Sequence, residues 1–385
     1  MLLTKVKKSI LSYTTIAFIL LSTSVVCAAP ITNKFEKKDT ELTSIIQQLL
    51  ASRVELLNST IVKSDTVNSL SSSNLDKLSK LYKKESTIAS FEKKRPEAWD
   101  KAQAKLQGKI NNFQLKGSVV SPPEINGDTA MIKAYEFMTF TWKDSKGKEI
   151  ESGIGIPHEF KASLNNEKWE VIDDSYDEGP LTDVIYNKQD RTKMSSPVNQ
   201  LNSDFSIQSI QSANFSYNRA AAVGCADSYV YPNSNPVAHV NWPNYYNLSF
   251  RNYNPPAGGG DCANFVSQCL LYGNAPYQNA YNDTSNAWWY NMSNATASTT
   301  WTYCPSQINF FTSYFGGTQT SSVSNLAAGD LIYYDWTSDG VKDHVAIVVD
   351  PNGGSPLIDA HNWDVYHVPY YAIKTGSTST VSLKF

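Results

Sequence analysis

The stretch GGGDCANFVSQCLL, residues 258–271, carries the strongest structural signal in the chain. Its apolar residues at positions 265, 266, 269 and 270 form one helical stripe, and the glycines before Asp261 predict a turn with Asp261 as the N-cap. Cys262 therefore falls in the first turn of a helix, where the helix dipole and free backbone amides favour a thiolate and an oxyanion. The glycines would let a substrate backbone approach closely. Position alone fits a small buried cysteine equally well.

A nucleophilic cysteine needs a base, and His344 follows Cys262 in a favourable context. The apolar segments 329–335 and 343–349 are separated by turn residues at 338–340, which predicts a β-hairpin with His344 at the start of its second strand. A strand-borne imidazole that faces a helix-borne thiol supports proton transfer from cysteine to histidine. We therefore expect His344 to be the base.

The next predicted strand, residues 356–361, is expected to carry the third catalytic residue. This strand would place His361 or Asn362 beside His344, where either side chain could orient the imidazole. We expect His361 to take this role, with Asn362 and Asp364 as alternatives.

Five motifs occur in order along the last 170 residues, namely GGGDCANFVSQ, the pair Trp288-Trp289, GDLIYYD, DGVKDHVAIVV and AHNWD. Together they resemble the putative amidase domain of secreted bacterial proteins, which is similar to the CHAP and NlpC-type papain-like cysteine hydrolases. The resemblance implies a papain-like α+β domain, in which a helix bearing Cys262 packs on an antiparallel sheet bearing His344. It also implies that these two residues are nucleophile and base. Ala263 stands where the family usually has Thr, a change that removes no catalytic group.

The tryptophan pair and the other aromatic residues of this region suggest a substrate cleft. Aromatic rings offer a large contact area for sugar or peptide faces, so we expect Trp288 and Trp289 to bind substrate. A Trp-rich core is the alternative reading.

The residues before this region predict a smaller α+β domain. Residues 39–106 have apolar positions at helical spacing, and four strand-like segments follow between residues 113 and 172. Helices followed by an antiparallel meander resemble the cone-shaped domains of the nuclear-transport-factor-like superfamily. His158 lies in HEFKA rather than in a zinc-binding HExxH, so we expect it to be structural.

Length, charge and the N-terminal residues indicate the class of protein and its domain organisation. The chain has 385 residues and a formal net charge of -3, which disfavours a protein that binds nucleic acid by neutralising phosphates. Three lysines, an apolar run and small residues at 28 and 29 predict a secretory signal over residues 1–29. The expected organisation is then an N-terminal domain over 30–186, a polar linker over 187–213 and an amidase-like domain over 214–385, with no membrane span after removal of the signal.

The cysteines do not predict a disulfide scaffold. Loss of Cys27 with the signal leaves four, and Cys262 and Cys269 on one helix would lie roughly 10 Å apart, too far to pair. Whether Cys225 and Cys304 form a bridge is left open. No CxxC pair occurs, so we expect no structural zinc, and the expected chemistry needs no metal or organic cofactor.

The resulting hypothesis is a secreted, extracellular or wall-associated hydrolase that cleaves an amide bond through an acyl thioester. Its expected substrate is a cell-wall peptide, as in peptidoglycan, or another extracellular amide. The alternative is a non-catalytic wall- or surface-binding protein that uses an aromatic groove on the same scaffold. A third reading has the same pair transfer the acyl group to an amine. The N-terminal domain would position the enzyme, bind a partner, or cover the cleft until it is removed at the linker.

Overall fold

The computed structural model describes residues 32–62, 76–83, 87–92, 94–186, 216–230, 246–253, 260–275, 277, 283 and 287–385. The expected leader (1–29) and linker (187–213) lie outside the described residues, as do Gly258 and Gly259. Among the described helices, none is both long and apolar enough to cross a bilayer.

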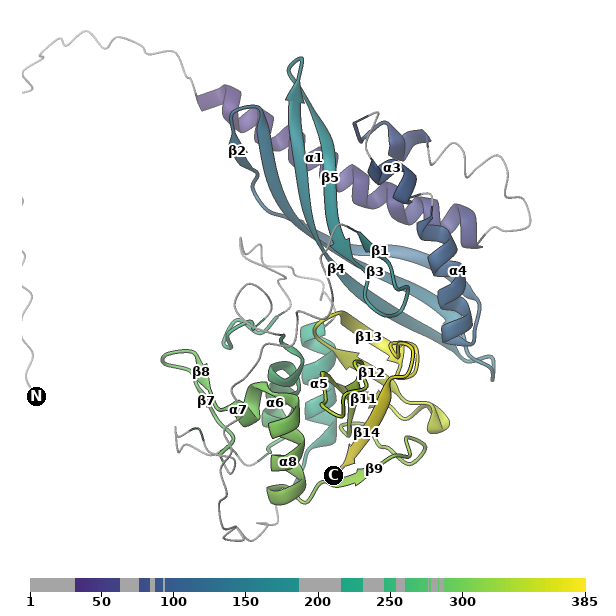
Figure 1. Ribbon diagram of the computed structural model, residues 1–385, viewed down its shortest axis with the longest axis vertical. Helices are drawn as coiled ribbons and strands as arrows, with labels where there is room; N and C mark the ends of the chain where they lie inside the picture. Colours follow the sequence, from purple (N-terminus) through teal and green to yellow (C-terminus); the bar gives the residue numbers. More distant parts are fainter. Residues whose placement is uncertain are drawn as a thin grey trace, which may run out of the picture.

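The N-terminal part consists of helices packed on one face of a long antiparallel sheet (Figure 1). The meander expected between residues 113 and 172 is present as β1, β3, β4 and β5, and its strands are longer than the sequence pattern indicates. The elements are α1 (Thr32–Leu57), the π-helical η1 (Asn58–Val62), α3 (Thr87–Glu92), α4 (Arg95–Leu106), β1 (Ile110–Val120), β2 (Glu124–Asn126), β3 (Thr129–Lys143), β4 (Glu149–Asn165), β5 (Lys168–Asp177) and β6 (Ile185–Tyr186).

Apolar and ionic contacts together hold the helices on this sheet. Trp99 of α4 packs edge-on against Phe113, with ring centroids 5.0 Å apart. Deeper in the interface, Arg53 of α1 donates to Asp174 at 3.0 Å and to Glu92 at 2.6 Å, and all three side chains are fully buried. Because each buried charge has an opposite partner, this network fixes α1 over the sheet.

His158 belongs to the same buried network. Its Nδ1 lies 3.0 Å from Asp174 Oδ1 and its Nε2 lies 3.3 Å from Glu136 Oε2. Burial alone would raise the pKa of Glu136, but the Arg95 charge and the bond to His158 lower it to about 2. The expectation of a structural histidine is therefore confirmed by its position between two carboxylates.

The C-terminal part packs helices on a second run of antiparallel strands, in the order β13-β12-β11-β10-β14-β9. Helices α5 and α6 lie against β11 and β12. The elements are α5 (Arg219–Val230), α6 (Cys262–Tyr272), β7 (Tyr290–Asn291), β8 (Thr296–Ala297), α7 (Thr299–Thr302), α8 (Cys304–Tyr314), β9 (Thr318–Thr320), β10 (Leu331–Asp335), β11 (His344–Asp350), the 3-10 turn η4 (Asn352–Gly354), β12 (Leu357–Ala360), β13 (Asp364–Pro369) and β14 (Ser379–Lys384).

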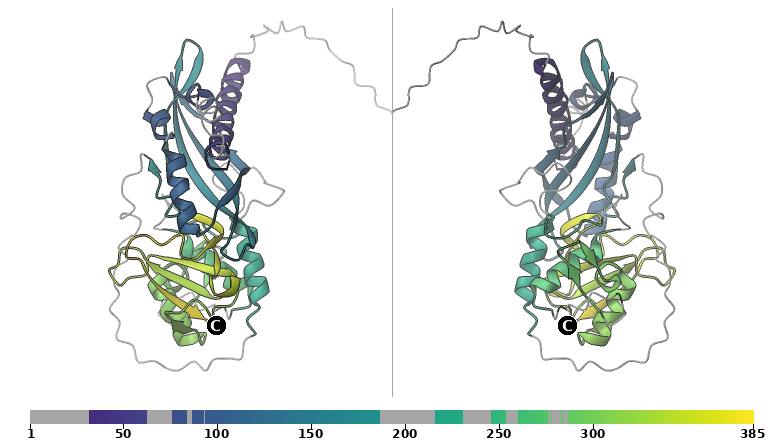
Figure 2. Two further views of the ribbon diagram at one scale, coloured as in Figure 1. Left: turned by 90° about the vertical axis from the view of Figure 1, so that its right-hand side faces the viewer. Right: turned by 90° about the vertical axis from the view of Figure 1, so that its left-hand side faces the viewer.

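The two parts share one sheet, which the sequence did not predict (Figure 1, Figure 2). Strand β4 pairs along its length with β3, while its other edge is divided between two partners. The later half of β4 pairs with β5, and Gly153–Gly155 pair antiparallel with Tyr366–Asp364 of β13. Strand β13 is thereby covered on its outer edge by the N-terminal part.

Candidate active site

Cys262 and His344 stand at the starts of two elements that pack against each other. Cys262 is the first residue of α6, and His344 is the first residue of β11. Tyr334 of β10 pairs with His344, which confirms the expected hairpin. Helix α6 lies on β11, so the helix N-terminus and the strand start meet at one place.

Asp261 occupies the N-cap position of α6 without capping it. Its side chain makes no hydrogen bond to the helix N-terminus; Oδ1 instead accepts from Tyr253 N–H and Asn264 Nδ2, both at 2.8 Å. Oδ2 lies 2.7 Å from His361 Nδ1. The carboxylate is buried and turned away from the helix end, so the expectation of a capping side chain was wrong. The first amides of α6 are consequently not used by this carboxylate.

The surroundings of Cys262 favour its thiolate. The Cys304 thiol, 3.8 Å away between the two Sγ atoms, lowers the pKa of Cys262 well below the usual value by hydrogen bonding. Burial opposes this effect, whereas a side-chain hydrogen bond with His344, its charge, and a bond from Val345 N–H lower the pKa further. The same pairing with Cys262, together with burial, raises the pKa of Cys304. The two shifts have opposite signs, so the contact favours the thiolate at Cys262 and the thiol at Cys304.

The other two cysteines lie apart from this pair. All four described cysteines are free and buried. Burial, followed by the neighbouring Cys225 thiol, raises the pKa of Cys269 well above its usual value. Cys304 thus faces Cys262 rather than Cys225, and Cys269 has an environment that suppresses its thiolate.

His344 is held by aromatic packing. The Trp336 ring stacks on it at a centroid distance of 4.5 Å and an interplanar angle of 24°. Trp363 meets Trp336 edge-on at 5.0 Å. In the described part of the chain, no carboxylate or amide side chain hydrogen-bonds to His344. The site therefore consists of the Cys262 thiol and the His344 imidazole, and the indole ring of Trp336 orients the imidazole.

None of the three candidates for a third catalytic residue is bonded to His344. His361, the preferred one, lies between Tyr246 and Phe265, with Nδ1 on Asp261 and Nε2 2.7 Å from Tyr229 O. Both of its ring nitrogens have other partners, so His361 does not orient the imidazole of His344 as expected. His361 instead holds Asp261, the residue before Cys262.

Asn362 and Asp364 are likewise engaged elsewhere. Asn362 Oδ1 accepts from the backbone N–H of Asp261. Asp364 accepts from Tyr135 and Tyr246, each at 2.6 Å. These contacts hold the segment between β12 and β13 in place. Asn362 and Asp364 therefore stabilise the surroundings of Cys262 and do not contact His344.

Trp288 and Trp289 are core residues, which corrects their expected role in substrate binding. Trp288 is fully buried, stacks on Trp301 at 4.7 Å and donates from Nε1 to Ser267 Oγ at 3.1 Å. Trp289 is 6% exposed. Side chains enclosed in this way have almost no surface to offer a ligand, and the alternative of a Trp-rich core is correct for this pair.

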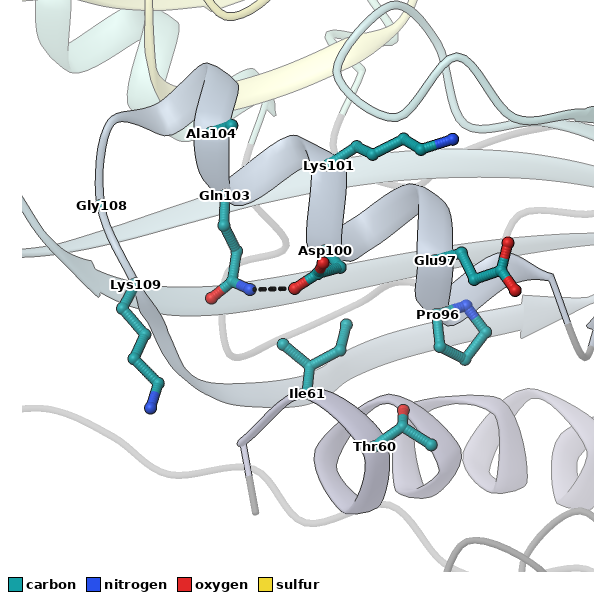
Figure 3. A pocket seen from close by; sticks show the side chains of 10 residues that line it. All are labelled: Thr60, Ile61, Pro96, Glu97, Asp100, Lys101, Gln103, Ala104, Gly108 and Lys109. Atoms are coloured by element: carbon teal, nitrogen blue, oxygen red, sulfur yellow. Dashed lines mark hydrogen bonds between the residues drawn. The ribbon is translucent and has the colours of Figure 1, made fainter. Parts of the chain in front are cut away.

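The structure has a small cavity near α6 and a larger groove in the N-terminal part. A small cavity of about 60 Å³ lies behind the start of α6 and is lined in part by Asp261, Asn264, Gln268 and His361. A groove of about 840 Å³ lies in the N-terminal part, between η1 and α4, with Glu97, Asp100, Lys101 and Lys109 on its walls (Figure 3). The groove shares no residue with the thiol–imidazole pair.

Cys304 and Trp336 are the site residues that sequence reasoning missed. Cys304 precedes Pro305 and begins α8, so the sequence signal for its position was a proline at the start of a helix. Gln307 of the same helix donates to Ala263 O at 2.9 Å and to Ser267 Oγ at 2.8 Å. These bonds tie α8 to α6 and keep the two sulfur atoms adjacent.

Comparison with known proteins gives a family match and a relative. Residues 216–383 match the family described as a putative amidase domain. The uncharacterized protein YhbB of Bacillus subtilis (strain 168) is 29% identical over 175 residues, which span 44% of this chain and 49% of that protein. The chain thus spans about half the length of this curated relative.

A search of solved structures found the intermembrane space region of the chloroplast protein ARC6. It has 9% sequence identity and a TM-score of 0.23, over 35% of this chain and 95% of that one, and a similarity of this size carries no argument about fold. The family match is the informative comparison, because it includes both Cys262 and His344. Residues 216–383 are therefore an amidase-like region, similar to the putative amidase domain family.

Proposed function

We propose that this chain is a secreted cysteine-dependent hydrolase of papain-like architecture that cleaves an amide bond, with Cys262 as nucleophile and His344 as base. The observation that carries the proposal is the placement of a thiol of lowered pKa at the N-terminus of α6, beside a strand-borne imidazole. Such a pair is the usual arrangement for covalent catalysis by cysteine. The family match supplies the reaction class.

The proposed reaction proceeds through an acyl thioester. His344 takes the proton of Cys262, and the thiolate attacks the amide carbonyl to give a tetrahedral oxyanion, which the amides at the start of α6 stabilise. The imidazolium then protonates the leaving amine as the C–N bond breaks. Water, deprotonated by His344, attacks the thioester and releases the acid and the free thiol.

We propose a peptide of the cell wall, or another extracellular amide, as the substrate class. The expected leader and the resemblance of the motifs to secreted amidases support this choice. The alternative of a non-catalytic aromatic groove loses its main support, since Trp288, Tyr290 and Trp301 are buried in the core.

The test compares Cys262→Ala with Cys269→Ala, which removes a buried thiol from the same helix. Hydrolysis of peptidoglycan fragments should be abolished in the first variant and retained in the second. Iodoacetamide should label Cys262 selectively, and labelling should persist below the roughly 8.5 pKa of a free thiol. A folded Cys262→Ala variant with full activity would refute the mechanism. Added amines test the transfer reading, because amide products in place of acids would show acyl transfer.

A further inference from the structure

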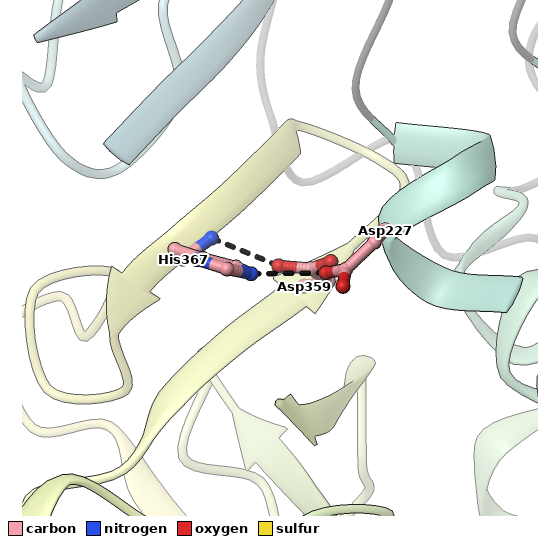
Figure 4. Close-up of side chains that lie close together, drawn as sticks. All are labelled: Asp227, Asp359 and His367. Atoms are coloured by element: carbon pink, nitrogen blue, oxygen red, sulfur yellow. Dashed lines mark hydrogen bonds and ion pairs between the residues drawn. The ribbon is translucent and has the colours of Figure 1, made fainter. Parts of the chain in front are cut away.

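A second cluster of chemically active side chains lies outside the thiol–imidazole pair. Asp227 of α5, Asp359 of β12 and His367 of β13 point toward one another (Figure 4). One potential ligand atom from each lies within 4.8 Å of the other two. His367 Nε2 is 2.9 Å from Asp227 Oδ1, and Asp359 Oδ1 accepts from His367 backbone N–H at 2.8 Å.

Asp359 contributes a buried oxygen, Oδ2, that accepts no hydrogen bond from an N–H or hydroxyl group of the described chain and has the carboxylate of Asp227 as its neighbour. The residue is 0% exposed, and its Oδ2 is buried without a hydrogen-bond partner. Burying a carboxylate oxygen without a partner is costly, so a group that completes its coordination would stabilise this arrangement. Asp359 Oδ2 is the atom that the cluster leaves available.

His367 is the basic group that contacts this pair of carboxylates. In the described part of the chain, neither Asp227 nor Asp359 forms an ion pair with a lysine or arginine. The nearby carboxylate of Asp350 is paired with Lys148 at 2.9 Å. A divalent cation placed among these side chains would supply a positive charge directly to the two carboxylates.

The backbone is distorted at this place. The register between β12 and β13 passes from Ile358↔Val368 to Ala360↔Val365, so that two residues of β13 stand opposite Asp359. His367 is one of the two and has φ 49°, a left-handed conformation that is uncommon for residues other than glycine. Such bulges redirect side chains, and backbone strain of this kind concentrates at functional sites.

We propose that Asp227, Asp359 and His367 bind one divalent transition-metal cation, through His367 Nε2, Asp359 Oδ2 and one oxygen of Asp227. Mixed imidazole and carboxylate ligands suit Zn²⁺, and also Mn²⁺, better than Ca²⁺ or Mg²⁺, which prefer oxygen throughout. Tetrahedral Zn²⁺ places neighbouring ligand atoms roughly 3.4 Å apart, so the bond between His367 and Asp227 would open only slightly.

The partial exposure of the cluster provides a way in for the ion. The side chains of His367 and Asp227 are 27% and 40% exposed, whereas Asp359 lies beneath them. The cation would join α5 to the bulge between β12 and β13. Strand β13 is also the strand that pairs with the N-terminal part. The site shares no residue with Cys262 and His344, so it stands independently of the proposed hydrolase activity.

The experiment uses the full chain carrying Cys262→Ala, so that the thiol–imidazole pair cannot contribute a metal ligand. Metal is removed with a chelator, and Zn²⁺ is titrated in competition with a chromophoric chelator. We expect one site per chain and a rise in the thermal midpoint. Asp359→Asn, Asp227→Asn and His367→Gln should each weaken binding by about tenfold or more. The control Asp128→Asn, at an exposed turn, should change nothing.

Two further measurements keep the outcome decisive. Asp227→Asn alters a half-exposed helix position, so this variant should fold. It therefore tests metal binding even if the buried Asp359→Asn variant does not fold. Mn²⁺ binding, followed by its paramagnetic resonance signal, should be lost in the same variants, because Mn²⁺ disfavours thiolate ligands. Absence of Zn²⁺ binding, or Zn²⁺ binding that survives both Asp227→Asn and His367→Gln, would overturn the proposal.

Discussion

The contact between Asp364 and Tyr135 gives a quantitative test of how the two parts of the chain are joined. Asp364 lies at the start of β13 and Tyr135 in β3, and the Tyr135 hydroxyl donates to Asp364 Oδ2 at 2.6 Å in a buried setting. Tyr246 donates to the other oxygen at the same distance. Hydrogen bonds to a charged group contribute about 1.5–3 kcal/mol each. Tyr135→Phe removes one such bond and leaves almost no cavity.

We expect Tyr135→Phe to lower the free energy of unfolding by about 1.5–3 kcal/mol, measured by urea denaturation at pH 7. Gly155→Ala should cost more, because an added Cβ would collide with the hydroxyl and the ring carbon Cζ of Tyr135. The matched control is Tyr314→Phe, which removes a half-buried hydroxyl and should cost less than about 0.5 kcal/mol. A loss for Tyr135→Phe as small as that of the control would refute the view that Asp364 joins the two parts.

The remaining predictions concern ionisable groups. Cys304→Ala removes the donor that lowers the pKa of Cys262, so alkylation of Cys262 at pH 6 should slow by about tenfold or more, as followed by mass spectrometry. The pKa of His361 is raised in the folded state: burial, the largest single effect, lowers it, but the bond to Asp261, the charges of Asp364 and Asp261 and the contact with Tyr229 O together raise it by more. The stability that His361 adds over a His361→Gln variant should therefore be full below about pH 6.5 and disappear as pH rises through its folded pKa, in urea unfolding from pH 5 to 9. Glu136 has a folded pKa of about 2, against 4.5 for a free carboxyl. It should contribute about 3 kcal/mol that is present above pH 5 and lost as pH falls toward 2, and this acid-dependent loss should be absent in Glu136→Gln.

The features that the sequence predicted are those with a local signal. The helix that begins at Cys262 shows in the spacing of its apolar residues, and the hairpin that presents His344 shows in two apolar runs around a turn. Each is encoded within about 20 residues, since helical and strand periodicities are short-range properties. The two elements predicted where Cys262 and His344 lie, and the ordered motifs implied their roles as nucleophile and base.

The third-residue prediction failed because backbone geometry between β12 and β13 departs from a strand. Asn362 and Trp363 have φ 61° and 30°, so the strand pairing that would place Asn362 opposite His344 ends there. The partner of His361 is Asp261, 100 residues earlier in the chain. Sequence spacing contains no information on a pairing of that kind.

Trp288 illustrates a different limit. A tryptophan pair in a hydrolase-like sequence fits a cleft wall and a core equally well, because the ring is apolar over most of its area and needs only one partner for its N–H. Ser267 supplies that partner inside the molecule. Only the position of Ser267 on α6, across from Trp288, decides between the two readings.

The shared sheet bears on the role of the N-terminal part. Strand β13 would present an unpaired edge if Gly153–Gly155 were absent, and exposed edges favour pairing with other chains. The adjoining contacts lie at the same edge, where Lys148 pairs with Asp350 and Ser152 Oγ donates to His367 O at 2.7 Å. A domain that merely covered the amidase-like region would leave the sheet of that region complete when removed. Here removal would take away a strand partner, so loss of the N-terminal part should reduce the stability of the β12–β13 segment, which carries His361 and Asp364.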